Sequence, residues 1–266
     1  MKRLIMSNII ILIPHFNNLS GLQKTIGSIN EEPMPDILVI DDGSKEKLVK
    51  SSIKYSGRVF FKFLKANSGI GTALNVGLDF AVAKKYEYTG RLDCGDLCHV
   101  NKFTKQLNYL SNNKDIKLLG SWARIVDDKG VFMYNLKHPV DYETIQRKMY
   151  QNSMFIHPTV IIRTEIISKT GKYPVKYRRA AQDYAFFFNI IRQFKSENYP
   201  EILLDYVMSK NSISHKNRKL QVYHRIRILI DNFYFGLTPI YSIIRNLILL
   251  TIPVKILTFI KSKTYK

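Results

Sequence analysis

The first hundred residues alternate short apolar runs with stretches whose apolar residues recur at helical spacing, and this alternation most constrains the fold. The apolar runs cover residues 8–13, 36–40, 59–64 and 86–92. The first, NIIILI, is apolar throughout after its opening asparagine, as in a strand buried on both faces. Strands that alternate with helices build a parallel sheet with helices on both sides. The sequence therefore predicts an α/β protein with a doubly wound, mostly parallel sheet.

Two helices are expected between these strands. The first has apolar residues at helical spacing: Leu19, Leu22, Ile26 and Ile29. Ser20 is a candidate N-cap for it. The second is expected over residues 71–84, where the apolar positions share one face: Leu74, Leu78 and Ala81.

The composition fits a folded protein with an anionic partner. The chain is 45% hydrophobic and 12% aromatic, which is enough to fill a core, and its formal net charge is +20. Such a charge favours nucleic acid, an anionic bilayer or phosphorylated small molecules, and does not choose among them. The basic residues are not interleaved with aromatic residues as in a nucleic-acid-binding module. We therefore expect no nucleic-acid partner.

The cysteines and the first residues bear on the compartment. Cys94 and Cys98 give no disulfide framework, which points to a reducing compartment. Residues 1–16 start like a signal peptide, with two basic residues and an apolar run, but they lack small residues at a cleavage site. We therefore expect a cytoplasmic protein.

Polar stretches follow three of the predicted strands, at the edge where open α/β sheets bind their ligands. They read PHFNN (14–18), DDGS (41–44) and DCGD (93–96). Carboxylates at neighbouring strand ends suit ribose hydroxyls and a hard divalent ion: Asp41, Asp42, Asp93 and Asp96. The alternative for residues 41–43 is an ordinary Asp-Asp-Gly turn. Zinc is disfavoured, because the C-x-x-x-C spacing of Cys94 and Cys98 has no second pair.

Other stretches are weaker signals when each is taken alone. NSGIGTALNVGL (67–78) does not fit G-x-G-x-x-G, because Leu74 stands where the third glycine belongs, so glycines for close packing at a helix entry are an equal alternative. His157 lies in HPTVIIR and is more often a packed or loop residue than a base. Asp183 starts a helix whose other face is apolar. Its carboxylate could therefore simply stabilise the helix by interacting with the positive end of the helix dipole.

Taken in order, these stretches resemble glycosyltransferase family 2, which has the GT-A fold. The matching pieces lie within residues 8–215 and include IIILIPHFNN, ILVIDDGS, NSGIGTALNVGL, RLDCGD, HPTVIIR and QDYAFFFNIIR. The resemblance implies inverting transfer of a sugar from a nucleotide-diphosphate-sugar to a saccharide acceptor. It also implies a place in bacterial surface polysaccharide synthesis, such as O-antigen, capsule or exopolysaccharide.

The resemblance implies a role for each matching donor-site residue. Phe16 would stack on the nucleobase and Asp42 would accept a hydrogen bond from it. Asp93 would lie near the ribose, and Pro14 and Asn67 would make further donor contacts. Uridine, thymidine and guanosine diphosphates are all open as the donor nucleotide, and on the resemblance alone we prefer uridine.

The resemblance also implies roles at the reacting end. Asp96 would hold a divalent cation, Mn²⁺ or Mg²⁺, that bridges the diphosphate. Asp183, in QDY, would be the general base. His157 and Gln182 are candidates for acceptor contacts or loop positions.

Two departures from the family pattern raise an alternative. Gly95 replaces the usual third aspartate of the donor loop, and Ser209 stands where many relatives carry a histidine. The alternative is a degenerate relative that binds nucleotide-sugar without turnover.

We expect a GT-A domain over residues 1–215 and a distinct segment over 216–266. The donor half would cover about 1–115 and the acceptor half about 116–215. After Asp205 the only acidic residue is Asp231, and the last segment mixes apolar runs with Lys and Arg. A helix lying on an anionic membrane is the favoured interpretation, ahead of packing on the catalytic domain and of a membrane span. The family resemblance supports it, because many bacterial members use lipid-linked saccharides at the inner face of the cytoplasmic membrane.

Overall fold

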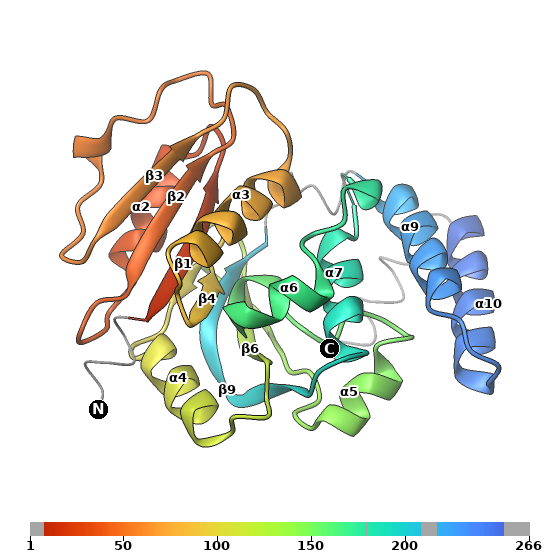
Figure 1. Cartoon of the computed structure of the whole chain (residues 1–266). Coiled ribbons are helices and arrows are strands. Elements are labelled where there is room, and N and C mark those ends of the chain that lie inside the picture. The colour runs from red at the N-terminus through yellow and green to blue at the C-terminus, as the bar shows by residue number, and fades with distance from the viewer. Residues whose placement is uncertain (1–7, 179, 209–216, 253–266) are drawn as a thin grey trace.

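The computed structural model describes residues 8–178, 180–208 and 217–252, which form a twisted sheet with helices on both faces (Figure 1). The strands are β1 (Ile9–His15), β2 (Asp36–Asp41), β3 (Val59–Phe63), β4 (Tyr88–Arg91), β5 (Leu97–Cys98), β6 (Leu118–Val126), β7 (Phe132–Leu136), β8 (Ile161–Arg163) and β9 (Ser196–Val207). The α-helices are α2 (Leu19–Gly27), α3 (Ile70–Ala83), α4 (Lys102–Asn112), α5 (Tyr142–Lys148), α6 (Ile167–Thr170), α7 (Gln182–Ile191), α9 (Arg218–Asp231) and α10 (Leu237–Thr251). Short 3₁₀ turns lie at Lys50–Ser52, His157–Thr159, Thr164–Ile166 and Val175–Tyr177.

The sheet has the order β3-β2-β1-β4-β8-β6-β9-β5, and β7 pairs with β6. The first four strands in this order are parallel to one another. Strand β8 is antiparallel to both β4 and β6, and β9 runs parallel to β6. The predicted α/β fold with a mostly parallel sheet is confirmed.

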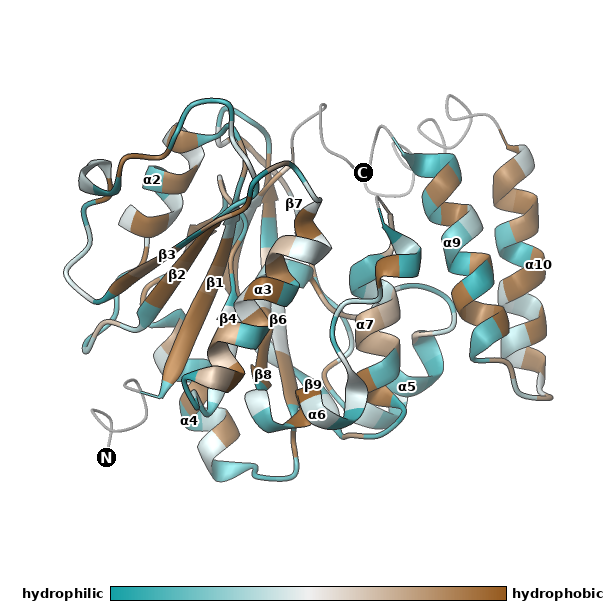
Figure 2. Ribbon diagram, turned by 45° about the horizontal axis from the view of Figure 1, so that its top comes forward, coloured by the Kyte–Doolittle hydropathy of each residue, from teal (hydrophilic) through white to brown (hydrophobic). Residues whose placement is uncertain are grey.

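Strand β1 lies inside the sheet and is buried on both faces, as its unbroken apolar sequence predicts (Figure 2). Ile10 and Leu12 pack against α3 on one face, while Ile9, Ile11 and Ile13 pack against α2 and α4 on the other. A Cβ atom on Gly77 of α3 would lie 2.8 Å from Leu12 Cδ1, so this glycine allows the helix to approach the strand closely. The predicted helix over 71–84 is confirmed with its apolar face inward.

The predicted cap of the first helix is wrong. Helix α2 begins at Leu19, and Asn18 Oδ1 accepts the backbone N–H of Gly21 at 3.0 Å. Ser20 lies inside the first turn, where its side chain cannot accept from the free amides that begin the helix.

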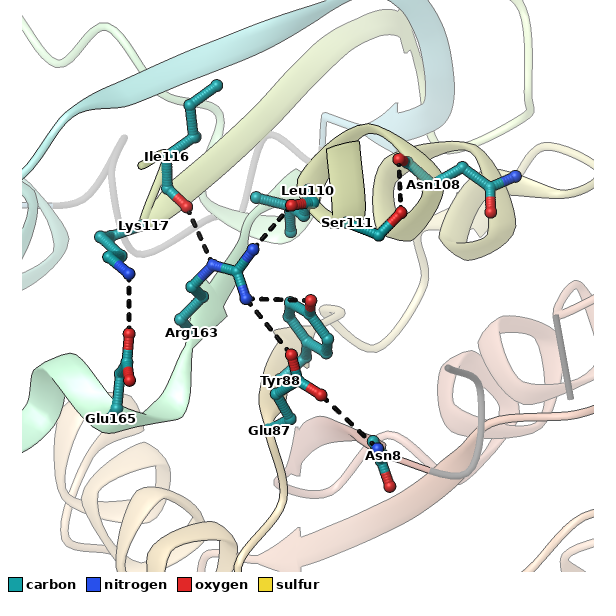
Figure 3. Close-up of polar contacts among 10 residues, drawn as sticks. All are labelled: Asn8, Glu87, Tyr88, Asn108, Leu110, Ser111, Ile116, Lys117, Arg163 and Glu165. Carbon is teal, nitrogen blue, oxygen red and sulfur yellow. Dashed lines mark hydrogen bonds and ion pairs between the residues drawn. The ribbon is translucent and has the colours of Figure 1, made fainter. Parts of the chain in front are cut away.

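A buried arginine ties the parallel part of the sheet to its second half (Figure 3). Arg163 ends β8 and donates to the carbonyls of Ile116 at 3.2 Å and Leu110 at 2.6 Å, the latter in the last turn of α4. It also donates to Glu87 at 3.2 Å and to the Tyr88 hydroxyl at 3.0 Å, at the start of β4. One guanidinium therefore fixes three elements that are far apart in sequence.

Helices α9 and α10 form an antiparallel pair beside α7 (Figures 1 and 2). Ile228 and Leu229 of α9 are buried in the core cluster that contains α3 and α7. Helical structure in the C-terminal segment is thus present over 218–231 and 237–251. Ser209 and residues 253–266 lie outside the described residues.

Candidate active site

The polar stretches that follow β1, β2 and β4 meet at one edge of the sheet. Asp42 donates its N–H to His15 O at 2.8 Å, which joins the ends of β2 and β1. The Cys94 thiol donates to Pro14 O at 3.2 Å, which joins the end of β1 to the loop after β4. The structure therefore brings PHFNN, DDGS and DCGD together, because the carboxyl ends of parallel strands share an edge.

The DDGS stretch holds the loop that enters α3. Asp42 is buried, and its two carboxylate oxygens accept the N–H groups of Ser68 and Gly69, each at 2.8 Å. Gly43 has φ +72°, and a Cβ atom there would lie 2.5 Å from the carbonyl carbon of Ala66. Asp42 thus places Asn67 and the start of α3 at the ligand edge.

Two of the expected donor residues are open to solvent at this edge. Phe16 follows β1 and is 44% exposed, although it is a large aromatic residue. Asn67 is exposed on the loop held by Asp42. A planar ligand can therefore reach both side chains.

Hydrogen bonds from Thr25 of α2 hold the DCGD loop in place. The Thr25 hydroxyl donates to the carbonyls of Asp93 and Asp96, at 3.1 and 2.9 Å, and accepts the N–H of Gly95 at 2.8 Å. Gly95 has φ +113°, a conformation that other residues adopt only with strain. The loop conformation thus suits the glycine that stands in place of the family's aspartate.

Asp96 is buried with half of its carboxylate unused. Its Oδ1 accepts the N–H of Val207 at 2.9 Å, while Oδ2 has no hydrogen-bond partner among the described residues. Burial raises the pKa of Asp96 well above its usual value, and the neighbouring Asp93 carboxylate raises it further. A cation near Oδ2 would favour the ionised form.

Arg91 lies at the centre of this cluster, and the sequence interpretation did not include it. It ends β4, is 2% exposed, and donates through Nη2 to Asp93 Oδ1. Its Nε and Nη1 atoms are buried and have no partner in the described part of the chain. The sequence signal was its place two residues before Asp93, which says nothing about burial.

Asp183 is presented by the first turn of α7. The preceding Ala181 has φ 60° and ψ 21°, the left-handed conformation that is strained for alanine. Burial by the surrounding protein raises the pKa of Asp183, Arg91 lowers it, and Asp93 raises it. Tyr206 is influenced by the same groups, so Asp183 and the DCGD carboxylates share one electrostatic environment.

His157 and Gln182 are packed against the segment around Tyr173 and Pro174. The His157 Nε2 lies 2.9 Å from the Tyr173 hydroxyl, and its ring meets Phe187 edge-on. Burial lowers the pKa of His157 well below its usual value, so the ring is neutral. Gln182 Nε2 donates to Pro174 O at 3.2 Å. Both side chains have protein partners in this structure.

The residues fit a divalent ion that is shared with a ligand. Within the described ranges there is no cluster of three or more His, Cys, Asp or Glu side chains placed to hold a metal. The unpartnered Oδ2 of Asp96 is one hard oxygen ligand. Mg²⁺ is commonly bound by one or two carboxylates plus substrate phosphate oxygens. Asp96 therefore suits an ion that arrives with a diphosphate.

Carboxylates thus lie at the ligand edge of an α/β sheet, with a further carboxylate, Asp183, at the start of a helix, an arrangement that suits the binding of a phosphorylated ligand and proton transfer. The family model "Glycosyl transferase family 2" matches residues 10–171. The chain belongs to this family and is a glycosyltransferase.

Relatives and a solved structure agree with this assignment. The amylovoran biosynthesis glycosyltransferase AmsE of Erwinia amylovora is 22% identical over 274 residues, covering 98% of this chain and all of the relative. The Escherichia coli UDP-Gal:alpha-D-GlcNAc-diphosphoundecaprenol beta-1,3-galactosyltransferase is 27% identical over 202 residues, covering 72% of this chain and 70% of the relative. A mannosyltransferase from Pyrobaculum calidifontis, in complex with GDP-Man and Mn²⁺, superimposes with a TM-score of 0.62 at 13% identity, covering 90% of this chain and 68% of that one. The fold is GT-A, as predicted, and the chain has relatives in bacterial polysaccharide biosynthesis.

Proposed function

We propose that this glycosyltransferase is an inverting enzyme that moves a sugar from a nucleotide-diphosphate-sugar to a lipid-linked saccharide in bacterial surface polysaccharide synthesis, such as O-antigen, capsule or exopolysaccharide. The observation that carries the proposal is the meeting of the loops after β1, β2 and β4 at one edge of the sheet, where Asp96 Oδ2 has no partner among the described residues and Asp183 lies within electrostatic reach. A base and a diphosphate site on opposite sides of one sugar are what a single displacement requires.

The donor half of the site binds the nucleotide. Phe16 stacks on the base from its exposed position after β1. Asp42 accepts a hydrogen bond from the base with the lone pairs that Ser68 and Gly69 leave free. Pro14 and Asn67 contact the donor at the same edge of the sheet, and Asp93 lies toward the ribose. We prefer a uridine nucleotide, as in the name of the E. coli relative.

Asp96 would hold the divalent ion, Mn²⁺ or Mg²⁺, through Oδ2, which has no partner among the described residues. The ion would supply positive charge that stabilises the departing diphosphate. Asp183 accepts the proton of the acceptor hydroxyl, which then attacks the anomeric carbon from the side opposite the leaving group. One displacement with one base inverts the configuration. His157 and Gln182 border the acceptor.

The acceptor is proposed to reach the enzyme at a membrane surface. None of the helices in the described ranges is long and apolar enough to cross a bilayer. Helix α10 nevertheless exposes apolar side chains on its outer face and is mainly hydrophobic in colour in Figure 2. The exposed residues are Leu237, Ile240, Tyr241, Ile244, Leu247 and Ile248.

The distribution of polar and apolar side chains on helix α10 is the opposite of that on a helix that packs on a core. Its fully buried positions include the polar residues Ser242 and Asn246, while the apolar face points outward. Phe235, in the turn before it, is 96% exposed. Residues 217–266 contain nine Lys or Arg and one acidic residue, Asp231, so an anionic bilayer attracts this segment. We therefore propose a cytoplasmic enzyme that is peripheral on the inner face of the membrane, with a catalytic domain over 1–215 and a membrane-associating segment over 216–266.

Donor binding and hydrolysis test the proposed activity. Full-length protein is screened by thermal shift against UDP-, dTDP- and GDP-sugars, with and without Mn²⁺, because a specific ligand stabilises the fold by mass action. We expect one donor to raise Tm in the presence of the ion and to release sugar slowly. Binding without any sugar release would favour the degenerate relative that Gly95 and Ser209 suggest.

Vesicle sedimentation tests the membrane association. We expect wild-type protein to sediment with anionic vesicles, less so as salt rises, and the double variant Phe235→Ser/Leu237→Ser to lose the salt-resistant fraction. The control is Phe132→Ser, which removes another exposed aromatic residue, on β7 and away from α10. Equal loss in both variants would contradict a specific role for the α10 side.

A further inference from the structure

Helix α9 lies directly against the turn that presents Asp183. His224 Nδ1 on α9 is 2.9 Å from the carbonyl oxygen of Ala180, three residues before Asp183. Arg225 follows His224 and is half-buried between α7 and α10. Asp183 and Tyr184 both act electrostatically on Arg225. A cation of the C-terminal segment thus lies on the helix that contacts the turn before the proposed base.

Arg245 of α10 is the second cation of this region. Its Nη1 donates to Gln151 O at 3.0 Å, and its charge acts on both Arg225 and Tyr184. Neither arginine has an ion pair among the described residues, and Arg225 has no hydrogen bond there. Burial lowers the pKa of Arg225, and the neighbouring Arg245 lowers it further.

Arg225 and Arg245 differ in this respect from three arginines that form ion pairs. Arg58, Arg124 and Arg163 each meet a carboxylate. Two neighbouring, partly desolvated guanidinium groups without an anion are unfavourable for folding. The arrangement suits a ligand that brings negative charge, and guanidinium groups bind phosphate oxygens in pairs.

Apolar side chains beside Arg245 indicate what the rest of the ligand is like. Ile244, next to Arg245, and Leu247 and Ile248, one turn further on, are exposed and apolar. A ligand that uses both surfaces has an anionic head near Asp183 and an apolar chain along α10. A saccharide carried on a lipid phosphate or diphosphate has this structure, with the accepting sugar between the base and the phosphate.

We infer that Arg225 and Arg245 form the subsite for the phosphate group of a lipid-linked acceptor, an inference that rests on the proposed function. The two side chains hold the phosphate one sugar away from Asp183, and α10 receives the start of the lipid. The site recognises the carrier and not the sugar.

Binding of short isoprenoid probes tests this subsite on the full-length protein. Farnesyl diphosphate, farnesol and inorganic pyrophosphate are titrated by calorimetry in EDTA, so that no divalent ion supports diphosphate binding at Asp96. We expect farnesyl diphosphate to bind at least about tenfold more tightly than either other probe. Arg225→Gln and Arg245→Gln should each weaken it roughly tenfold or more, as loss of a charged hydrogen bond does.

Arg227→Gln is the matched control, because Arg227 lies two residues along the same helix but is exposed. It changes net charge equally and should leave farnesyl diphosphate binding unchanged. If all three variants weaken farnesyl diphosphate binding equally, the loss follows from net charge alone, and the proposed subsite is wrong. Equal affinity for farnesyl diphosphate and pyrophosphate would assign the pair to free phosphate and also overturn it.

Two further measurements separate folding and the proposed function from the subsite. Arg225→Lys keeps the charge without the paired donors, so a folded Arg225→Lys variant that binds as tightly as wild type would overturn the role of the guanidinium. Hydrolysis of the nucleotide-sugar is measured in wild type and in Arg227→Gln, in which it should be unchanged. If wild type hydrolyses no donor, the proposed activity fails whatever the isoprenoid probes show; if it does, and Arg225→Gln still binds farnesyl diphosphate normally, the subsite alone fails.

Discussion

Two buried arginines lie on neighbouring strands of the sheet, Arg163 on β8 and Arg91 on β4, and their surroundings differ. Arg163 donates to two backbone carbonyls, a carboxylate and a tyrosine hydroxyl (Figure 3). Arg91 donates to Asp93, and its Nε and Nη1 atoms have no partner in the described ranges. Both side chains are at least nine-tenths buried.

The comparison separates stability from function. A buried donor without a partner costs free energy, so a chain selected for stability alone would satisfy Arg91 as fully as Arg163. Of the seven buried side-chain atoms that have no partner among the described residues, four lie at the ligand edge: His15 Nδ1, Arg91 Nε, Arg91 Nη1 and Asp96 Oδ2. We interpret Arg163 as a structural residue and Arg91 as part of a polar site whose surroundings are completed by substrate.

The largest expected effect is on Arg163. Arg163→Met leaves the carbonyls of Leu110 and Ile116 and the Glu87 carboxylate without their partner, and we expect the free energy of unfolding to fall by about 3–5 kcal/mol. Arg91→Met should cost much less, because it leaves fewer groups unpaired, yet it should lower turnover. Urea unfolding measures both. The control is Lys117→Met, which removes a solvent-exposed ion pair and should change stability by less than ~1 kcal/mol. Equal losses for the two arginine variants would contradict the comparison.

The second effect is on Asp183. Asp183→Asn should lower kcat by at least ~10², about 2.7 kcal/mol, with donor affinity and stability nearly unchanged, because the base acts in the transition state. The pKa of Asp183 is raised, so wild-type kcat should fall as pH drops through that raised value, above the range of an ordinary aspartate. Arg91 lowers this pKa, so Arg91→Met should move the acidic limb to still higher pH. Loss of donor binding in Asp183→Asn would make this residue a donor ligand.

Much of the fold could be predicted because local pattern and tertiary environment agree. The run at 8–13 is apolar because β1 is buried on both faces, and the ends of parallel strands must meet. The convergence of DDGS and DCGD therefore followed from strand order alone. The first cap was misassigned because Asn18 and Ser20 are both good cap residues, and the start of the helix decides between them.

The features that were missed depend on contacts between distant residues. Arg91 lines a small cavity together with Tyr173 and Phe186, which are far along the chain, and a single arginine in a sequence carries no sign of such contacts. A helix lying on a membrane was expected within residues 216–266, but only packing against α9 shows that Ser242 and Asn246 face inward. Strain at Ala181 is likewise invisible in its sequence.

A third buried cation sharpens the comparison, because Lys102 can lose its charge. It is fully buried at the start of α4, donates to Gln106 at 2.7 Å and to Thr159 O at 3.3 Å, and burial lowers its pKa from 10.5 to about 8. The unfolded chain binds this proton more tightly, so stability rises as pH passes from about 8 toward 10.5. Between pH 7 and 9 wild type should gain about 1 kcal/mol relative to Lys102→Met. A constant difference across this range in urea titrations would show that the amine stays charged.

The smallest expected effect concerns the strain that presents Asp183. Ala181→Gly removes the cost of a left-handed alanine, and we expect the free energy of unfolding to rise by up to about 1 kcal/mol. The same change one turn later, Ala185→Gly, lies in the helix interior and should lower it by about 0.5–1 kcal/mol or more, since a buried methyl group is also lost. Opposite signs for one chemical change would locate the strain at the residue before the QDY stretch. If Ala181→Gly is also more stable but several-fold slower, the rigid strained turn serves to fix the base, as Arg163 fixes the sheet. If both variants lose stability equally, the turn stores no strain, and the position of Asp183 follows from helix packing alone.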